Sequence, residues 1–448
     1  MSFEERRERV LEEAKKLDVR LVELQFVDLL GTTKSLTIPI QRLEKALSEG
    51  VGFDGSSIEG FVRIYESDMI AVPDPYTFRI FPWRPSEKKE ARIICDLRRP
   101  GGGVFEGDPR YILKKALREL KEEGLIYNTG PELEFFLLRT DGEPRVEPLP
   151  HDVGSYFDFS PLDRAGDVRR DAIFTLQDIG LDVEMSHHEV APGQHEIDFK
   201  FEEALTSADN VITYKNAIKA TALSHGLYAT FMPKPFFGVN GSGMHTHQSL
   251  YETGSGRNAL YDPDDQYNLS SLAYHFIGGQ LKHSREMSAV LAPTTNSYKR
   301  LVPGYEAPVY ICWGRRNRSA LIRVPEYHPE NEEDVRAELR CPDPSCNPYL
   351  AFTVMLKAGL DGIKNKVQPS DPVEEDVYGF DDRKLAQFYV RTLPASLEEA
   401  INEFEESRLM KETLGDYAFE RYLTAKKEEW DEYRIQVTNW ELKKYMKL

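Results

Sequence analysis

The chain has few cysteines and no long apolar run. Only four of its 448 residues are cysteine, which is too few for a disulfide scaffold, and the last two are not spaced as a zinc site: Cys95, Cys312, Cys341 and Cys346. No apolar stretch approaches the roughly 20 residues that span a bilayer. The opening residues, MSFEERRERVLEEAKK, are charged and helical in period, unlike a signal peptide. These absences predict a cytoplasmic protein with reduced thiols and no membrane partner.

Basic residues are also in short supply. The chain has 57 Lys and Arg against 75 Asp and Glu, a formal net charge of −18. Such a surface argues against nucleic acid or an anionic membrane as the main partner. A hydrophobic fraction of 40% supports substantial cores, and 448 residues exceed what one core usually holds. We therefore expect at least two structural units.

A boundary between two units is predicted near residue 104. The first hundred residues contain strand-like runs and one helical run near 42–48; the strand-like runs are 21–27, 34–38, 70–72, 78–81 and 93–97. The segment RRPGGGVFEGDP then concentrates glycine and proline just before a helical segment, RYILKKALRELKEEG. We expect a first domain over 1–104 and a second over 105–448. The second mixes strands and helices to about residue 350 and then turns mainly helical, with amphipathic segments near 396–414 and 417–431, so the class is α+β.

The segment GPELEFFLL places two carboxylates on one face of a strand. Side chains alternate along a strand, so Glu132 and Glu134 share a face while Leu133, Phe135 and Leu137 share the other. Taken alone, the pattern fits a solvated strand end as well as a functional site.

The segment VEMSHHEVAPGQHEIDF carries two more carboxylates. If Pro192 and Gly193 form the turn of a hairpin, Glu189 lies opposite Glu196, although Pro-Gly suits a type II turn better than the turns that hairpins prefer. Carboxylates about 5 Å apart repel by roughly 3 kcal/mol at an effective dielectric near 20. If Glu132 and Glu134 meet this pair, bound cations would be needed to offset the repulsion.

Two histidines follow a glycine-rich segment, NGSGMHTHQSL. Gly241 and Gly243 let the backbone approach a ligand, and the strand after them places His245, His247 and Ser249 on one face. Histidines in such a pattern serve either as structural groups or as ligands. The chain shows neither a phosphate-binding loop of the Gly-Lys-Ser/Thr kind nor a dinucleotide fingerprint.

Five arginines are concentrated within about 40 residues. The guanidinium group is a natural partner of carboxylate and phosphoryl oxygens, so more than one anionic substrate is indicated by Arg300, Arg318, Arg323, Arg336 and Arg340. The alternation around residues 336–340 alone would also suit a solvated edge strand.

Together these segments resemble the signatures of the type I, or bacterial and archaeal, glutamine synthetases. The similarity is carried by FDGSSIEGF, GPELEFFLL, HHEVAPGQHEI, FMPKPFFGVNGSGMHTHQSL and NSYKRLVPGYEAPV, and it continues through RNRSALIRVP and CPDPSCNPYLAF to GLDGIKNKV. It covers essentially the whole chain. The resemblance implies an N-terminal β-grasp domain and a catalytic domain of curved antiparallel strands with helices packed outside. It also implies a dodecamer of two stacked hexameric rings, with active sites between neighbouring subunits.

The resemblance further implies the ligand sets. One Mg²⁺ or Mn²⁺ ion would be held by Glu134, Glu189 and Glu196, and a second by Glu132, His245 and Glu338. Glutamate would be bound by Asn240, Gly241, Arg300 and Arg340. ATP would contact Glu184, Phe201, His247, Ser249 and Arg336, with Arg318 and Arg323 at its phosphates.

The implied reaction is the ATP-dependent amination of glutamate by ammonia, a step of nitrogen assimilation. The glutamate side chain takes the γ-phosphate of ATP while Arg318 and Arg323 neutralise developing charge, and ammonia then attacks the γ-glutamyl phosphate. Asp54, with Ser57, would bind ammonium and take its proton. Glu306 would shield the acyl phosphate from water.

Two other functions are compatible with much of the sequence. A ligase that aminates glutamate with another amine would keep the metal and arginine sites and lose the ammonium pocket, which is intact here at Asp54 and Ser57. A non-catalytic structural member would lose metal ligands, and none is missing.

The resemblance also predicts how the activity is regulated. FVRIYESDM resembles the subtype inhibited by glutamine through the arginine at Arg63. The surroundings of Tyr378, EEDVYGFDD, depart from the pattern for adenylylation. We expect glutamine feedback through Arg63 and no adenylylation, while the sequence leaves open whether small regulatory proteins bind.

Overall fold

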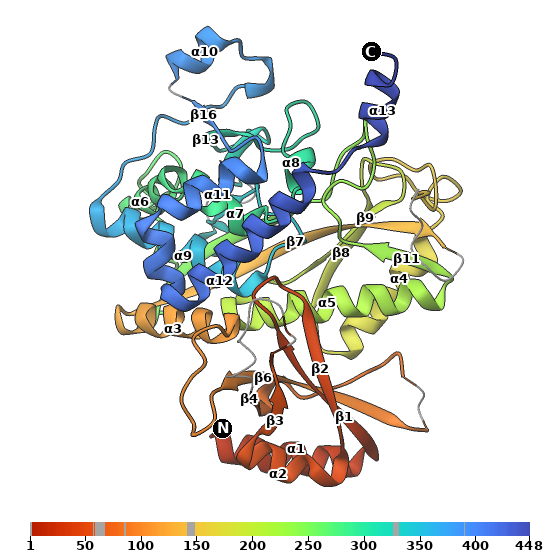
Figure 1. The fold of residues 1–448 in the computed structure, drawn as a ribbon. Coiled ribbons are helices and arrows are strands. Elements are labelled where there is room, and N and C mark those ends of the chain that lie inside the picture. The colour runs from red at the N-terminus through yellow and green to blue at the C-terminus, as the bar shows by residue number, and fades with distance from the viewer. Residues whose placement is uncertain are drawn as a thin grey trace.

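The computed structural model describes residues 2–56, 58, 68–84, 87–140, 148–325, 331–388 and 390–448. A small sheet at the N-terminus, red to orange in Figure 1, lies below a much larger body built on a second sheet. Within the described residues, no helix is long and apolar enough to cross a membrane.

The first sheet has six strands in the order β2-β1-β6-β4-β3, with β5 paired to β6. Its strands are β1 (Val19–Val27), β2 (Thr33–Pro39), β3 (Val51–Asp54), β4 (Asp68–Pro73), β5 (Arg79–Ile80) and β6 (Lys89–Arg98). Helices α1 (Phe3–Lys16) and α2 (Leu43–Glu49) pack on it through Val10, Ala14 and Leu47, which join its core. A capping box of Ser2 and Glu5 starts α1. The edge strand β3 ends at the exposed Asp54.

The second sheet has ten strands in the order β16-β13-β14-β15-β12-β7-β9-β8, and β7 also pairs with β10 and β11. All its printed pairings are antiparallel except β13 with β14. The strands are β7 (Leu125–Arg139), β8 (Val183–His188), β9 (Gln194–Phe199), β10 (Glu202–Glu203), β11 (Leu227–Thr230), β12 (Met244–Glu252), β13 (Tyr310–Gly314), β14 (Ala320–Arg323), β15 (Ala337–Leu339) and β16 (Arg391–Thr392).

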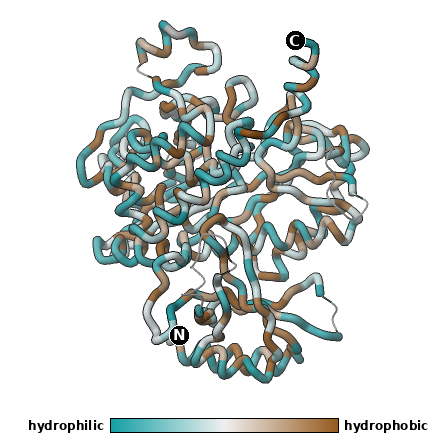
Figure 2. The backbone as a smooth tube through the Cα atoms, viewed as in Figure 1, coloured by the Kyte–Doolittle hydropathy of each residue, from teal (hydrophilic) through white to brown (hydrophobic). Residues whose placement is uncertain are grey.

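Helices cover the larger sheet and form most of the last hundred residues (Figure 1). They are α3 (Pro109–Glu122), α4 (Gly166–Asp178), α5 (Ala204–Ser224), α6 (Ser271–Lys282), α7 (Ser284–Leu291), α8 (Ser297–Arg300), α9 (Pro348–Asn365), α10 (Asp382–Gln387), α11 (Leu397–Glu406), α12 (Arg408–Arg434) and α13 (Asn439–Tyr445). In Figure 2, brown marks the apolar residues of the interior strands and α9, whereas apolar and polar residues alternate along the outer helices. Helices α6 and α9 meet at Gly279 and Gly362, where a Cβ on either glycine would lie 2.6–2.7 Å from the backbone of the other glycine and closer still to a carbonyl of the facing helix.

The predicted elements agree with the structure except at the edges. The strand-like run 21–27 lies in β1, 34–38 lies in β2, and 93–97 lies in β6; the helical run near 42–48 corresponds to α2. The amphipathic segments 396–414 and 417–431 fall on α11 and α12, and the break between them coincides with the non-helical Gly415 at φ 77°. The edge strand β3 was not predicted, because its four residues carry no clear alternation.

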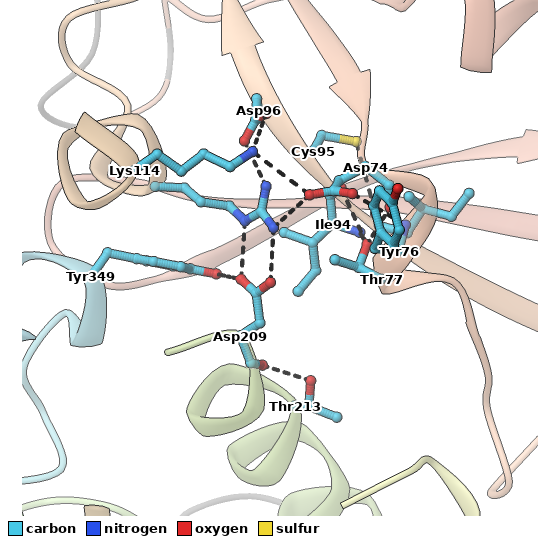
Figure 3. Close-up of polar contacts among 12 residues, drawn as sticks. Asp74, Tyr76, Thr77, Ile94, Cys95, Asp96, Lys114, Asp209, Thr213 and Tyr349 are labelled. Atoms are coloured by element: carbon cyan, nitrogen blue, oxygen red, sulfur yellow. Dashed lines mark hydrogen bonds and ion pairs between the residues drawn. The ribbon is translucent and has the colours of Figure 1, made fainter. Parts of the chain in front are cut away.

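A buried arginine joins the two sheets. Arg110, in the first turn of α3, makes a two-pronged contact with Asp209 of α5, at 3.0 Å from Nε and 2.9 Å from Nη2. The same guanidinium donates to Asp96 of β6 at 2.6 Å and to Asp74 after β4 at 2.8 Å. Figure 3 shows Asp74, Asp96 and Lys114 on one side of this cluster and Asp209, held by Tyr349, on the other. The cluster fixes the first sheet against α5.

Replacing Arg110 should destabilise the whole chain. Arg110→Ala leaves three carboxylates without their shared cation, and breaking a buried ion pair in this way costs about 3–5 kcal/mol. We expect a markedly lower thermal midpoint by calorimetry. Arg408→Ala is the matched control, because Arg408 is 90% exposed and its ion pair is with Glu412 in the next turn of the same helix, so its loss should cost less than about 0.5 kcal/mol. Equal midpoints for the two variants would contradict this role of Arg110.

Candidate active site

Strand β7 divides its side chains as predicted. Leu133, Phe135 and Leu137 are buried in the main core, whereas Glu132 and Glu134 point to the opposite face. One backbone amide and one side-chain amide hold Glu134. Gly243 N–H and Gln194 Nε2 donate to the same Glu134 Oε2, at 3.0 and 2.8 Å. The long strand therefore presents a positioned carboxylate in front of an apolar layer.

The hairpin of β8 and β9 brings further carboxylates to this face, in a register that differs from the prediction. Glu196 lies opposite His187 on β8 and directly opposite Glu134 on β7. Glu189 is opposite Gln194, whose carbonyl accepts its N–H at 2.8 Å, so the predicted pairing of Glu189 with Glu196 is wrong.

The turn explains this shift. Gly193 has φ 71° and Gln194 N–H donates to Ala191 C=O at 3.0 Å, a geometry that places Pro192 and Gly193 at the centre of the turn, as expected. The backbone twist of such a turn does not match the twist of the two strands. Residues 190–193 therefore form a four-residue loop, and strand pairing starts at Glu189 and Gln194. Glu189 still faces the site.

A second group gathers where β12 and β15 meet β7. His245 lies opposite Glu132 in the sheet, with Nδ1 3.5 Å from a Glu132 oxygen and 3.8 Å from a Glu338 oxygen. Glu338, on β15, is almost fully buried. The predicted second ligand set is thus assembled by three neighbouring strands.

The two carboxylate groups differ in their electrostatics. Burial raises the pKa of Glu134 to about 7 and, together with the Glu134 charge, that of Glu189 to about 9; burial and Asp198 raise the pKa of Glu196 well above its usual range. Glu338 behaves oppositely. Burial would raise its pKa, but the charge of Arg340, whose Nη1 lies 2.5 Å away, and that of His247 hold it at about 2. Arg323 Nη1 also donates to Glu338 at 2.9 Å.

Most of the predicted site residues line one cavity of about 410 Å³. Its lining contains all six predicted metal ligands, all four predicted glutamate-binding residues, and Glu306, Arg318 and Arg323. Segments from residue 132 to residue 340 converge on it. Such convergence of acidic and guanidinium groups on one hollow is the usual mark of a binding site for charged ligands.

Arg300 lies in the cavity wall with its guanidinium turned to the backbone. It donates to the carbonyls of Arg340, Cys341 and Pro342 at 2.9–3.2 Å. Gly241 and Gly243 pack against it so closely that a Cβ at Gly243 would lie 2.6 Å from Arg300 Nη2. The glycines that sequence reasoning assigned to ligand approach thus also make room for this arginine.

Glu306 is part of the cavity lining. Asn240 Nδ2 donates to Glu306 Oε2 at 3.2 Å, which joins a predicted glutamate-binding residue to the predicted shielding residue. Glu306 has φ 56°, an unusual left-handed conformation for a residue other than glycine, and strain of this kind is often found at functional loops.

Of the predicted nucleotide residues, Arg318 and Arg323 line this cavity, whereas its lining does not include Glu184, Phe201, His247, Ser249 or Arg336. Phe201 and His247 both flank Gly130 of β7, and Arg336 Nε donates to His247 Nδ1 at 3.1 Å, so His247 Nε2–H is the donor to Glu132 at 2.7 Å. Ser249 is two residues beyond on β12, opposite Asn128, and Glu184 is exposed on β8.

Asp54 does not meet the other predicted residues within one chain. It is exposed at the end of β3 and does not line the cavity. A hydrogen bond from Ser56 N–H lowers its pKa, so it is ionised. Ser57 and Arg63 lie outside the described residues.

Sequence reasoning missed a carboxylate next to the first ligand set. Asp198 is two residues after Glu196 on β9 and is buried, and neither of its oxygens has a hydrogen-bond partner among the described residues. It gathers with His187 and Glu196 closely enough to share an ion. The alternation in QHEIDF was the available signal.

Asp152 is a second residue that the sequence did not indicate, and it forms hydrogen bonds with residues of the β8–β9 hairpin. It accepts from Gly193 N–H at 2.9 Å and bonds His188 Nε2 at 3.0 Å, while His188 Nδ1 contacts the Glu189 carbonyl at 2.6 Å. Nothing in the local sequence around Asp152 indicates this contact.

The donors fit divalent cations. Carboxylate oxygens with one imidazole suit Mg²⁺ or Mn²⁺. Both side-chain oxygens of Asp198 are buried without a hydrogen-bond donor among the described residues, and a cation would supply the partner that they lack. The cluster of Glu132, His245 and Glu338 has its ligand atoms within 4.8 Å of one another, which is compatible with a single ion.

Comparison with known proteins agrees with the geometry. Residues 106–445 match the family described as "Glutamine synthetase, catalytic domain", and residues 18–100 match "Glutamine synthetase, beta-Grasp domain". Glutamine synthetase from Methanosarcina mazei is 54% identical over 99% of this chain and 98% of its own length; that from Clostridium saccharobutylicum is 49% identical over 98% of each.

Solved structures agree in fold. A structure titled "GmaS/ADP complex-Conformation 1" superposes with a TM-score of 0.89 at 32% identity, covering 98% of this chain and 99% of the other. A Plasmodium falciparum glutamine synthetase superposes with a TM-score of 0.88 at 27% identity, covering 99% of both chains. The predicted β-grasp and α+β catalytic architecture is confirmed.

The metal-free protein should lose stability as pH rises. Because folding raises the pKa of Glu134 to about 7 and of Glu189 to about 9, the folded state holds protons that the unfolded chain has released above pH 4.5. Stability should therefore fall between about pH 5 and pH 9, by at most about 1.4 kcal/mol per pH unit for each such group.

Calorimetry with a chelator, and then with Mg²⁺ or Mn²⁺, measures this slope. The cation should raise the midpoint most at the alkaline end, because it replaces the protons. Glu189→Gln should flatten the metal-free slope, whereas Glu406→Gln, at an exposed site, should leave it unchanged. Identical midpoints with and without cation at pH 9 would refute the argument.

Proposed function

The chain belongs to the glutamine synthetase family and is a glutamate–ammonia ligase, and for this reaction we propose the cavity around Glu134, Glu196 and Glu338 as the active site. The observation that carries the proposal is the convergence of all predicted metal ligands and glutamate-binding residues on that one cavity. Membership of this family implies that the enzyme uses a divalent metal and ATP. The assignment of each residue below is part of the proposal.

We assign Glu134, Glu189 and Glu196 to one cation and Glu132, His245 and Glu338 to a second, with Mg²⁺ or Mn²⁺ as the ions. When bound, the ions supply positive charge beside the transferring phosphoryl group. The carboxylates lie on adjacent strands with apolar residues behind them, which limits their movement. Asp198 adds negative charge beside the first set.

ATP would occupy the side marked by Phe201, His247 and Arg336, with Glu184 and Ser249 nearby, and glutamate the side marked by Asn240, Gly241 and Arg340. Arg318 and Arg323 line the cavity and would neutralise charge as the glutamate carboxylate attacks the γ-phosphate. Arg300 would orient residues 340–342 through its three carbonyl contacts as well as bind substrate. The product of this step is γ-glutamyl phosphate and ADP.

Ammonia attack on the acyl phosphate needs a base for ammonium, and we assign Asp54, with Ser57, to this step. Glu306, held by Asn240, would cover the acyl phosphate and exclude water. Since Asp54 does not line the cavity of its own chain, we propose that a neighbouring subunit supplies it within a homo-oligomer, a dodecamer of two six-membered rings.

Exposed apolar residues support an oligomer. The segment after α12 carries Ile435, Val437, Trp440 and Met446, each at least 63% exposed, and Figure 1 shows α13 projecting from the body. Apolar surface of this kind is typical of a subunit contact. We further place the domain boundary after residue 104 and the protein in the cytoplasm, in keeping with four free cysteines.

For regulation, we propose glutamine feedback through Arg63 and no adenylylation of Tyr378. Tyr378 is half-buried, and its hydroxyl donates to the carbonyl of Ala307, next to Glu306, at 2.8 Å. Burial raises its pKa to about 12. Both features oppose its use as a nucleophile.

An assay with several amines tests the function. Purified protein with ATP, Mg²⁺ and glutamate should form glutamine only when ammonia is present, should accept hydroxylamine, and should turn over methylamine or putrescine much more slowly. Glu338→Ala should abolish turnover, because it removes a metal ligand and leaves Arg323 and Arg340 without their carboxylate. Turnover that prefers another amine, or that is independent of ammonia, would contradict the ammonium pocket.

Mixing two inactive variants tests the shared site. Asp54→Ala lacks the base and Glu338→Ala lacks a metal ligand, and each homo-oligomer should be inactive. When subunits exchange, some sites pair an intact Asp54 with an intact Glu338, so activity should return. If labelled subunits are seen to exchange and no activity returns, each site is built within one chain.

A further inference from the structure

A second cavity, of about 480 Å³, lies where the first sheet meets the larger body. Its walls come from residues 31–33 in the β1–β2 turn, α5, residues 228–233, and the loops before α8 and α9. It shares no lining residue with the proposed active site. Nothing in the proposed reaction uses it.

Two lysines of α5 face this cavity. Lys215 and Lys219 are one helical turn apart, and their Nζ atoms lie 6.0 and 5.8 Å from the centre of the Phe231 ring, so both ammonium groups gather around one side chain. Neither makes an ion pair with a carboxylate among the described residues, whereas Lys114 and Lys357 in α3 and α9 do.

Among the described residues, the lining of the cavity offers donors, and the carboxylate that acts on Lys215 lies outside that lining. Lys215 is half-buried; burial lowers its pKa to about 8, and the Lys219 charge acts in the same direction. Asp343 acts on Lys215 from outside the lining, and its own pKa is raised by burial. Within the described part of the chain, the lining contains no Asp or Glu, although the chain carries a net charge of −18.

Several neutral donors complete the site. Thr32, Thr33, Asn216 and Thr294 line the cavity beside the two lysines, and Tyr228, Phe231 and Met232 provide an apolar wall. Ser345 also lines it, but its hydroxyl already donates to Asp343. Ammonium groups with hydroxyl and amide donors are the usual environment of a bound oxyanion. We propose that this cavity binds a small oxyanion ligand, carrying a phosphoryl group or two carboxylates, between Lys215 and Lys219.

Such a ligand would lie behind the segments that build the proposed glutamate site. The Pro233 carbonyl accepts from Ser242 N–H at 2.8 Å, next to Gly241. Asn296 exchanges hydrogen bonds with the backbone of Lys234 at 2.7 and 3.0 Å and begins the helix that carries Arg300. Occupancy would therefore change the apparent affinity for glutamate, a consequence that rests on the proposed function.

Lysine labelling tests the site directly. Whole protein is treated with limiting acetic anhydride at pH 8, and modification of each lysine is followed by mass spectrometry with increasing inorganic phosphate or succinate, at constant ionic strength set with NaCl. Near ten times the dissociation constant, labelling of Lys215 should fall about tenfold. Lys45, which is exposed on α2, should be unaffected. Protection by one anion alone identifies its chemical class.

Variants separate a local from a distant effect. In Lys219→Met, protection of Lys215 should require a higher anion concentration, whereas Lys219→Arg should keep most of it. Unchanged protection in Lys219→Met would mean that the anion acts from elsewhere and would overturn the proposal. So would the absence of protection by both anions, or equal protection by NaCl alone. Because labelling does not depend on turnover, its failure is distinguishable from failure of the ligase assignment.

Discussion

Glu134 and Glu196 lie directly opposite each other on adjacent strands, and the rest of the site is arranged around that contact. When both carboxylates are ionised, they repel by roughly 3 kcal/mol, and burial and neighbouring charges accordingly raise the pKa of each. The strands still pair because their opposite faces are mainly apolar, with Leu133, Phe135 and Ile197 buried in one core. Burial of each such side chain contributes about 1.5–3 kcal/mol. The core therefore outweighs the repulsion, and the sheet holds a site that favours a cation.

The two proposed ligand sets differ in how they accommodate their carboxylates. Glu338 has Arg323 and Arg340 beside it and is ionised with a pKa of about 2, whereas Glu134 and Glu189 have raised pKa values and retain protons. A cation entering the first set must displace protons, while one entering the second must share a carboxylate with two arginines. The first set thus couples metal binding to pH, and the second is already formed without metal.

Local alternation predicted which side chains share a face, and that part of the sequence reasoning was correct for β7 and β12. It could not give the register of the β8–β9 hairpin, because the turn at Pro192 and Gly193 leaves four residues unpaired. Contacts between distant segments were also out of reach. Arg110 reads as one charge among many in a helix, and only the fold places it between Asp96 and Asp209.

The Arg110 cluster also bears on how the site is completed. It ties α3 and α5 to β6, and Arg92 of β6 adds a bond to Thr213 of α5 at 2.7 Å. Moving the first sheet so that Asp54 reached its own cavity would break these contacts, at a cost of several kcal/mol for the buried ion pairs alone. Asp54 on a neighbouring subunit needs no such movement, since it lies exposed at the end of an edge strand. The same ion pairs that stabilise one chain therefore favour a site that two chains share.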